Sequence, residues 1–512
     1  MDRAGLTHKP DDCDTSSSDS GGKMSFSKGN MGDTGWRQKE AGSGSSGDRL
    51  PAAQRLLSYY GDDFTGSTDV LEALFRAGLR AALFLEPPSE QLLARKFADL
   101  EAIGVAGIGR SLTPEEAERE LRPVLEQLRK IGSAITHYKI CSTFDSSAEV
   151  GSIGKAAEIG RSVFGSGYVP ILAGVPYLGR YTLFGNHFAA AGGEMYRLDR
   201  HPTMSRHPIT PMAEADLRQH LAQQTDLKTA LMDILALEGD AAEVGERLAK
   251  LVEREQPDLV LFDVLDEARL AAAGQLIWAE AQQRDGLFAI GSSGVEYALG
   301  ACWRKLGLLQ EQPESSAASA AEVERLLVVS GSCSPVTEQQ IKAALAAGFA
   351  GVRVPAEELL DGKKGAAARQ RLLKEAREKL ADGRSLLLYS AEGVDDPGIP
   401  RFRETLAAQG YGPEQSSRLL GALLGALARE LIIDEQLTRI VIAGGDTSGY
   451  VTRGLGIYAL ECVAALTPGA PLCRAFSEES ALDGLELVLK GGQIGERDFF
   501  TRMKQGRTAY AE

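Results

Sequence analysis

Short apolar segments alternate with helical patterns from residue 56 to the end of the chain. Most of these segments end at small or polar turn residues, and apolar residues at helical spacing follow many of them. Such runs are typical of strands buried on both faces of a parallel sheet. The pattern predicts an α/β fold with parallel or mixed sheets covered by helices, one sheet in each half of the chain. We expect strands at residues 81–85, 103–108, 137–141, 169–173, 259–264, 288–290, 326–329, 385–389, 439–443 and 485–489, and helices at 114–130, from 337 onward and at 416–431.

The segment Leu57–Asp69, LSYYGDDFTGSTD, joins the end of a buried strand to the start of a helix. Gly61, Asp62 and Asp63 supply the turn, and the hydroxyl residues behind them can cap the helix. Two adjacent carboxylates thus follow a strand and precede a helix, where open α/β sheets place their chemistry. Such a pair can hold Mg²⁺ or accept a proton from a hydroxyl, although turn formation and helix capping explain it equally well.

The composition of the chain changes at two places. Residues 1–50 are rich in Gly and Ser and lack aliphatic periodicity, so they predict a disordered N-terminal extension. Residues 309–324, LQEQPESSAASAAEVE, lose the hydrophobic pattern, and we interpret them as a linker. The remainder divides into two α/β domains, residues 51–308 and 325–512, with a cleft expected between them.

Net charge and cysteine spacing exclude several classes of protein. The 512 residues carry a formal net charge of −15 at pH 7, so neither a nucleic-acid partner nor an anionic membrane is expected. The six cysteines contain no CxxC pair, which favours reduced thiols in a cytoplasm over a zinc site or a disulfide framework. No apolar run approaches the ~18 residues of a membrane span, and the N-terminus lacks the apolar core of a secretory signal. The sequence leaves the oligomeric state open, a homo-oligomer included.

Three turns of the second half share one construction, an apolar strand followed by Gly and by Ser, Thr or Gln. Residues 330–334, 444–448 and 490–495 bring backbone N–H groups and polar side chains to the end of a strand, and helices begin behind two of them. Taken singly, each is an ordinary turn. Together they favour a site for a nucleotide polyphosphate, although the chain contains neither a Walker A loop nor a GxGxxG fingerprint.

Polar residues of the first half suit a small anionic substrate. Lys139, Asp145, Arg180, Asn186 and His187 follow predicted strands or lie in the long connection that comes after residue 173. Arg binds a carboxylate with a bidentate fork and Lys supplies a point charge, but each residue is equally compatible with a solvated surface.

The connection at residues 174–212 is expected to be irregular, and irregular segments of this length are commonly functional. His201 and His207 both precede proline and favour loop ordering over metal binding, because no ligand partner stands at the required spacing. Cys141 and Cys333 favour core or turn positions over a nucleophilic role.

Six short motifs in a fixed order resemble the four-carbon acid sugar kinase family, from about residue 56 to about residue 500. They are GDDFTGSTD, GRxT with GxH at 179–187, HPxTPM at 207–212, SGSCSPVT, GGDTS and KGGQIG. The resemblance implies an ATP-dependent kinase of sugar acids such as threonate, erythronate or their 3-oxo forms, with an N-terminal substrate domain and a C-terminal nucleotide domain. Relatives often carry KxDSTLRG where this chain has Cys141 in place of the acid and Asp145 in place of the arginine. This departure implies a related oxo or branched acid as the substrate.

The residues implied by the resemblance agree with those found from the pattern. Asp62 and Asp63 are expected to be catalytic, one as the base and the other orienting substrate or a water on Mg²⁺, with the assignment open. The residues expected to bind substrate are Lys139, Asp145, Arg180 and His187. The residues expected to bind ATP are Ser330, Ser332, Ser334, Gly444, Gly445, Asp446, Thr447, Gly491 and Gly492.

The sequence predicts phosphoryl transfer by positioning and charge stabilisation. One alternative is an NAD(P)-linked acid-sugar enzyme, which requires a fingerprint that residues 444–449 lack in its usual form. The other alternative is a non-catalytic acid-sugar sensor, for which the chain offers no DNA-binding element.

Overall fold

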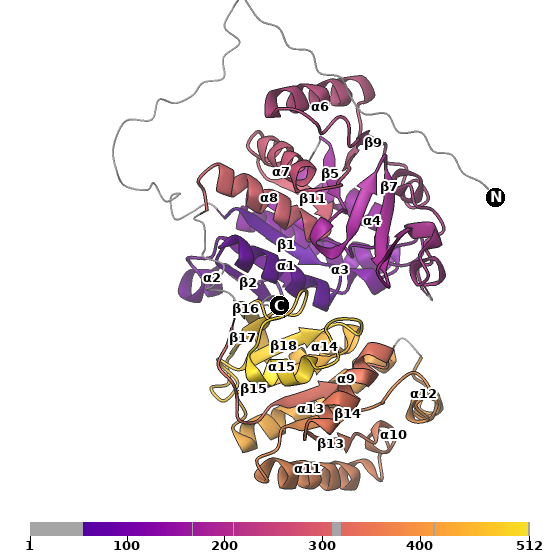
Figure 1. Cartoon of the computed structure of the whole chain (residues 1–512), viewed down its shortest axis with the longest axis vertical. Coiled ribbons are helices and arrows are strands. Elements are labelled where there is room, and N and C mark those ends of the chain that lie inside the picture. The colour runs from indigo at the N-terminus through magenta and orange to yellow at the C-terminus, as the bar shows by residue number, and fades with distance from the viewer. Residues whose placement is uncertain (1–54, 166, 208, 310–318, 413–414, 510–512) are drawn as a thin grey trace, which may run out of the picture. The chain divides into compact units, whose positions relative to one another are not determined.

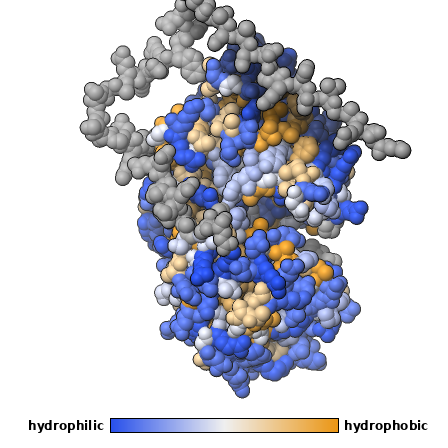
Figure 2. All heavy atoms as spheres, in the orientation of Figure 1, coloured by the Kyte–Doolittle hydropathy of each residue, from blue (hydrophilic) through white to orange (hydrophobic). Residues whose placement is uncertain are grey.

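The computed structural model describes residues 55–165, 167–207, 209–309, 319–412 and 415–509 (Figure 1). The predicted extension at residues 1–50 lies outside the described residues, as does most of the predicted linker. Figure 2 shows a surface on which hydrophilic residues predominate. Within the described ranges, no helix is both long and apolar enough to cross a membrane.

Eight strands from the described first half of the chain lie in the large sheet and pair in parallel with one another. They are β1 (Leu57–Gly61), β2 (Ala81–Phe84), β3 (Ala102–Ala106), β4 (Ile135–Lys139), β5 (Val169–Leu172), β9 (Thr229–Met232), β10 (Leu259–Phe262) and β11 (Leu287–Gly291). Their order is β2-β3-β1-β4-β11-β5-β10-β9. The chain leaves β1 toward β2 on one side and leaves β4 toward β5 on the other. In open α/β sheets, ligands bind outside the carboxyl ends of the strands at such a reversal.

Helices cover both faces of these strands. They are α1 (Phe64–Ala77), α2 (Glu90–Lys96), α3 (Pro114–Ile131), α4 (Ile153–Phe164), α5 (Leu217–Leu221), α6 (Ala241–Glu255), α7 (Glu267–Ala281) and α8 (Gly294–Lys305). Apolar residues of α1, α6, α7 and α8 join one buried cluster, and those of α3, α4 and α5 join a second. The strands lie between the two clusters, as expected for a sheet buried on both faces.

The second half repeats the arrangement with β12 (Leu327–Ser330), β13 (Ala350–Arg353), β14 (Leu386–Tyr389), β15 (Arg439–Ala443), β16 (Ile457–Ala464), β17 (Leu472–Ser477) and β18 (Glu486–Lys490). Strands β13, β14, β12, β15 and β18 pair in parallel in that order. The helices are α9 (Pro335–Ala346), α10 (Ala356–Leu359), α11 (Gly365–Ala381), α12 (Gly398–Ala408), α13 (Ser416–Glu435), α14 (Gly445–Gly454) and α15 (Phe499–Gln505). The predicted α/β class with mixed strand directions is thereby confirmed.

The expected two sheets are joined into one. Strands β16 and β17 pair antiparallel with each other, and β16 also pairs antiparallel with β2 through Ala459 and Leu460. The result is a single 15-stranded sheet. A hydrophobic pattern shows only the period of each segment, so it cannot predict which strands pair when they are so distant along the chain. The cleft expected between the domains stays a prediction.

We expected the connection at residues 174–212 to be irregular, and this prediction was wrong. It contains a separate antiparallel sheet of β6 (Arg180–Leu183), β7 (Asn186–Ala191) and β8 (Glu194–Arg197). Two-residue turns join these strands, at Phe184–Gly185 and at Gly192–Gly193, and all four residues have positive φ. This is the backbone of type I′ hairpin turns, for which Gly-Gly is a known signal.

Candidate active site

Asp62 and Asp63 follow β1 directly, and Lys139 is the last residue of the neighbouring β4. The backbone N–H of Asp62 donates to the carbonyl of Lys139 at 2.9 Å. Both carboxylates and the ammonium therefore lie at the carboxyl ends of β1 and β4, where the strand connections reverse.

Arg110 binds both carboxylates. It lies in the short 3-10 helix Gly109–Ser111 that follows β3. Its Nε and Nη2 donate to the two oxygens of Asp62 at 3.2 and 2.7 Å, and Nη2 also donates to Asp63 Oδ1 at 3.0 Å. The sequence-based prediction missed Arg110, although it follows a predicted strand, as several of the chosen residues do. A search for cations behind every predicted strand would have found it.

Asp63 also caps α1. Its Oδ1 accepts from the backbone N–H of Gly66 at 2.9 Å, and its Oδ2 accepts from the Thr65 hydroxyl at 2.9 Å. Gly61 is required before this turn, because a Cβ there would collide with the Ser67 side chain. The capping role considered from the sequence is therefore confirmed, and these bonds fix the position of the Asp63 carboxylate.

The two carboxylates differ in exposure and in acidity. The Asp62 side chain is 4% exposed and that of Asp63 is 17% exposed. Burial raises the pKa of Asp62, and the charge of Arg110 opposes the rise without cancelling it. Burial acts in the same direction on Asp63, but Arg110 and Lys139 outweigh it and hold the Asp63 pKa below its usual range. Asp63 is therefore the more accessible carboxylate and the one more firmly ionised.

Lys139 is buried within the same group of charges. Its Nζ lies 3.5 Å from Asp69 Oδ2. Burial lowers the Lys139 pKa, but the carboxylates of Asp69, Asp63 and Asp62 outweigh burial and hold the pKa above its ordinary value. Lys139 is thus a charged ammonium at the strand ends. Asp69 was not among the predicted site residues, although it closes the motif that begins at Gly61.

The loop behind β4 carries the departure from the family motif. Thr143 Oγ1 donates to Asp145 Oδ1 at 2.6 Å, so the Cys141 thiol, 3.0 Å from the same hydroxyl, donates to it. Burial raises the pKa of Cys141 to about 11, which keeps it a thiol at neutral pH. Asp145 is 8% exposed. These contacts fix one oxygen of its carboxylate.

Within the described part of the chain, only some of the hydrogen-bond donors of the Arg180 side chain have partners, and these partners lie in its own segment. Nη1 donates to the carbonyls of Leu178 and Gly179 at 2.9 and 3.2 Å, whereas Nε is buried and has no partner among the described residues. Burial lowers the Arg180 pKa, while the charge of Asp145 acts in the opposite direction. Arg180 and Asp145 therefore belong to one electrostatic neighbourhood.

His187 is buried, and both of its ring nitrogens are engaged. Nε2 donates to the carbonyl of Ser142 at 2.8 Å, and Nδ1 accepts from the Thr182 hydroxyl at 3.0 Å. Burial lowers the His187 pKa to about 4. A direct contact with substrate would break one of these bonds, so we interpret His187 as holding the loop that carries Asp145.

His201 and His207 order loops, as the sequence favoured. His201 Nδ1 accepts from the backbone N–H groups of Thr203 and Met204, and His207 Nδ1 accepts from Thr210. Across the described part of the chain, no group of three or more His, Cys, Asp or Glu is arranged to hold a metal ion.

The three glycine turns of the second half follow neighbouring strands, β12, β15 and β18. Ser334 caps α9 by accepting from the Thr337 N–H, and its hydroxyl donates to the carbonyl of Gly492. Ser332 Oγ accepts from the Ser334 N–H at 3.2 Å. Ser330 Oγ is buried without a partner among the described residues. The turns behind β12 and β18 are thus bonded to each other.

Gly444–Thr447 follow β15 and begin α14, and the side chain of Asp446 lies outside the described part of the structure. Gly444 has a φ of 145°, which favours glycine. A Cβ at Gly331 would stand 2.7 Å from Thr447 Cγ2, and one at Gly492 would stand 3.2 Å from Ser334 Cβ. The predicted ATP-binding turns therefore converge, and glycine is needed where they touch.

The glycine turns also meet the carboxylate turn. A Cβ at Gly491 would lie 3.9 Å from Thr65 Oγ1, the hydroxyl that donates to Asp63, and one at Gly449 would lie 2.7 Å from the Phe64 ring. The start of α1 thus contacts both β18 and α14. Phe64 and Thr65, the residues that come directly after Asp62 and Asp63, therefore lie close to residues in or directly after the predicted nucleotide turns.

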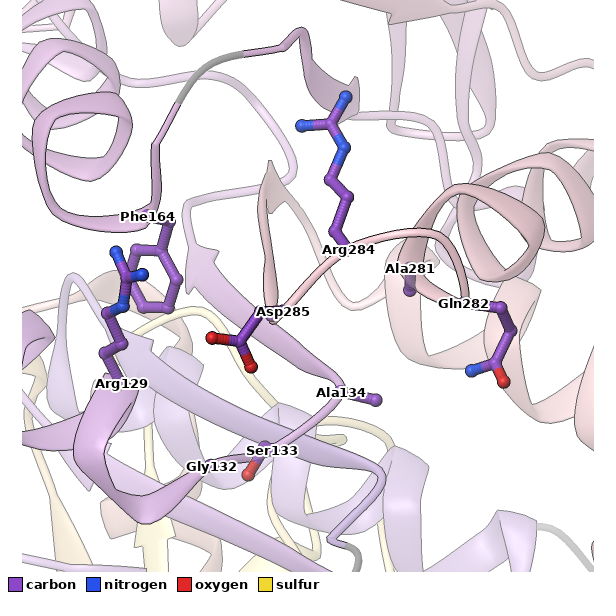
Figure 3. Close-up of a pocket in the computed structure, with 10 residues that line it drawn as sticks. Arg129, Gly132, Ser133, Ala134, Phe164, Ala281, Gln282, Arg284 and Asp285 are labelled. Carbon is purple, nitrogen blue, oxygen red and sulfur yellow. The ribbon is translucent and has the colours of Figure 1, made fainter.

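A cavity of about 170 Å³ lies elsewhere (Figure 3). Its lining includes Arg129, Ser133, Phe164 and Asp285. Ala134 directly precedes β4 and Gly286 directly precedes β11, so the cavity lies at the amino ends of these strands. Asp62 and Asp63 lie at the carboxyl ends, so the cavity is at the opposite edge of the sheet.

Comparison with known proteins finds two domain models. The first, a sugar-binding N-terminal domain, matches residues 57–299, and the second, a nucleotide-binding C-terminal domain, matches residues 327–500. The chain is 48% identical to 3-oxo-isoapionate kinase of Paraburkholderia graminis over 456 residues, covering 89% of this chain and 95% of that protein. It is 31% identical to 3-oxo-tetronate kinase of Pseudomonas savastanoi pv. phaseolicola, covering 88% and 97%.

Solved structures share the fold. A protein from Salmonella typhimurium LT2 superposes with a TM-score of 0.68 at 25% identity, covering 88% of this chain and 98% of that one. A Haemophilus influenzae protein superposes with a TM-score of 0.65 at 23% identity, covering 87% and 99%. The curated relatives are kinases, so the comparison confirms the predicted phosphotransferase class over the NAD(P)-linked and sensor alternatives. The chain belongs to the four-carbon acid sugar kinase family.

Proposed function

We propose that the protein transfers the terminal phosphoryl group of MgATP to a hydroxyl of a small 3-oxo sugar acid, and that it does so in the cytoplasm. The first candidate acceptor is 3-oxo-isoapionate, because the relative named for that substrate is 48% identical, against 31% for a relative named for 3-oxo-tetronate. Residues 51–308 would bind the acid and residues 325–512 the nucleotide. The predicted change of substrate at Cys141 and Asp145 agrees with this choice.

One observation carries the proposal. The hydroxyl of Thr65 donates to Asp63 and lies 3.9 Å from the place of a Cβ at Gly491. A kinase must bring an acceptor hydroxyl into line with the terminal phosphate of its nucleotide. The proximity of Thr65 to Gly491 supports a site in which the Asp63 carboxylate stands near a turn suited to bind phosphate.

In this proposal Asp63 accepts the hydroxyl proton. It is the more exposed of the two carboxylates, and its lowered pKa keeps it ionised. A carboxylate with a lowered pKa is a weak base, but it is strong enough for this step, because phosphoryl transfer depends mainly on positioning and charge stabilisation. Asp62 holds Arg110 in a two-point ion pair, and Arg110 in turn fixes Asp63. Lys139 supplies a positive charge toward the transferring group.

The donor set fits magnesium that arrives with ATP. Mg²⁺ is usually held by one or two carboxylates together with substrate phosphates and water, rather than by a cage of protein ligands. Asp62 and Asp63 supply such carboxylates, and the described residues contain no larger cluster. When bound, Mg²⁺ would neutralise charge on the phosphates.

Arg180 and Asp145 would bind the other end of the acid. Arg180 has a buried, unpartnered Nε with which to donate to the substrate carboxylate. Asp145 has one oxygen fixed by Thr143, which leaves the other to accept from substrate hydroxyls. An acceptor in place of the family's usual arginine suits a substrate with an additional hydroxyl group at this end.

ADP release by the purified full-length protein tests the proposal. The assay contains Mg²⁺ and ATP with 3-oxo-isoapionate, the 3-oxo-tetronates, threonate or erythronate. We expect the highest kcat/KM with 3-oxo-isoapionate. Faster turnover of a four-carbon acid would keep the kinase and overturn the branched substrate. No turnover of any acid, with ATP still bound, would overturn the sugar acid assignment.

Asp145→Asn should change substrate affinity selectively. Asparagine can still accept from Thr143 but carries no charge, so we expect the KM for the acid to rise about 10- to 100-fold, the value of a hydrogen bond to a charged group. The KM for ATP should stay the same. Asp258→Asn is the matched control, because Asp258 pairs with Arg161 just before β10, at the other end of the strands. An unchanged KM for every acid in Asp145→Asn would remove Asp145 from the substrate site.

A further inference from the structure

Lys490, the last residue of β18, is fully buried. Its Nζ lies 2.9 and 3.3 Å from the carbonyl oxygens of Gly491 and Gly492 and 3.0 Å from Thr337 Oγ1. Carbonyl oxygens only accept, and the Thr337 hydroxyl is itself placed to donate to the carbonyl of Gly492. All three neighbours of the lysine are therefore acceptors, which match the three donors of an ammonium group and exceed the two of a neutral amine.

No carboxylate within the described residues pairs with this ammonium group. Across the sheet it lies opposite Ala443 on β15, and it faces Thr337 on α9 and the Phe499 ring on α15, whose centroid is 6.0 Å away. Several charged residues on the packed elements are paired with one another, as in Glu338–Lys342, Arg439–Glu486 and Arg502–Asp498. Burial lowers the Lys490 pKa to about 7. A buried cation without a counter-ion is unfavourable, so a nearby anion should stabilise it.

The bonds of Lys490 fix the turn proposed to bind nucleotide. Gly492 O accepts from Lys490, from Thr337 and from Ser334, so the turn behind β18 is tied to the start of α9. The lysine donates to the backbone carbonyls of Gly491 and Gly492. It can therefore hold the turn without touching the nucleotide itself. It sets the position of the turn and places a positive charge behind it.

We propose that Lys490 is a positioning residue that couples nucleotide binding to the uptake of one proton from solvent. The nucleotide polyphosphate is the counter-ion that the buried ammonium lacks, so binding favours the protonated lysine, and the protonated lysine favours binding. The two effects are equal because linkage is reciprocal. This inference rests on the proposed nucleotide site in residues 325–512.

The coupling has a defined direction with pH. Well below pH 7 the free protein already carries the proton, and binding takes up little. Above pH 7 the free lysine loses its proton, so binding must restore it, and affinity for ADP should fall up to about tenfold per pH unit until the bound lysine also titrates. The ordinary titration of the nucleotide phosphates is the same for every variant and cancels in comparisons.

Calorimetry of ADP binding to the full-length protein at pH 8, with Mg²⁺, in two buffers of different ionisation enthalpy measures the proton directly. We expect the wild type to take up about half a proton or more in excess of Lys490→Met. Lys490→Met should bind ADP about tenfold more weakly at pH 7, with a smaller difference at pH 9. Lys490→Arg keeps a charge that does not titrate, so it should bind ADP without the excess uptake.

Arg439→Lys is the matched control. Arg439 is equally buried and lies on the adjacent β15, but it has a counter-ion in Glu486. This variant should lose thermal stability and keep the proton uptake of the wild type. If the methionine variant does not fold, ADP binding to the wild type still tests the coupling. An affinity of the wild type for ADP that stays constant between pH 7 and 9 would overturn it. Absence of ADP binding by the wild type would instead overturn the nucleotide site itself.

Discussion

Asp63→Asn is expected to lower kcat about 10³-fold at saturating ATP and acid, the middle of the range for loss of a positioned base. Asparagine caps helices as well as aspartate does, so the bond from the Gly66 N–H and the start of α1 should survive. Affinity for ADP should stay within a few-fold, because Asp63 is proposed to act on the acceptor hydroxyl. Steady-state ADP release and calorimetric ADP binding measure the two quantities.

Asp240→Asn is the matched control for this change. Asp240 caps α6 through bonds from the N–H groups of Ala242 and Glu243, far along the chain from the carboxylate turn. It loses the same charge at the same helical position and should keep its kcat. Asp62→Asn separates the two carboxylates. If Asp62→Asn abolishes turnover while Asp63→Asn retains it, the base is Asp62 and our assignment is wrong.

The sequence located the carboxylate turn because its chemistry is local. Asp62 and Asp63 stand between a buried apolar run and a helical pattern, and a strand followed by a helix exposes such a turn at the edge of a sheet. The glycine turns were found by the same rule. Their convergence was expected from their shared construction. The proximity of Gly331 to Thr447 and of Gly492 to Ser334 now gives it geometry.

Other features required information that a local pattern does not hold. Arg110 follows β3, which lies beside β1 in the sheet, so its contact with Asp62 depends on strand order. Likewise His187 meets Ser142 only because the hairpin of β6 and β7 packs back on the loop behind β4. The adjoining hairpin of β7 and β8 was readable from Gly192-Gly193, and we missed it by giving weight to the prolines and histidines around it.

The antiparallel strands β16 and β17 show a further limit. Their residues are mostly apolar and were not predicted as strands, yet they connect β18 to β2 and make one sheet of two. A strand's neighbours are chosen by the packing of the whole chain, and hydrophobic period carries no information about them. For the same reason the sequence suggested two domains in series but not the contact between α1 and the turn at Gly491.

Arg110→Met is expected to lower kcat by about 10²-fold or more and to destabilise the fold by about 3 kcal/mol at pH 8. Breaking a buried ion pair from one side leaves an uncompensated charge, and such changes usually cost 3–5 kcal/mol. We take the lower end because the Arg110 side chain is 26% exposed, while Asp62 is only 4% exposed. Urea unfolding and ADP release measure the two effects.

The pH dependence distinguishes this mechanism from a general loss of packing. Without Arg110, the two adjacent carboxylates repel each other in a buried place, and their pKa values in the folded protein should rise above those in the unfolded chain. The folded variant then binds more protons than the unfolded chain, so its stability falls as pH rises through this range. The loss of stability should be smaller at pH 5 than at pH 8. Arg80→Met, which breaks an exposed pair with Asp99, should cost less than about 1 kcal/mol at either pH. A loss in Arg110→Met that is equal at both pH values would mean that packing, and not charge, is what Arg110 supplies.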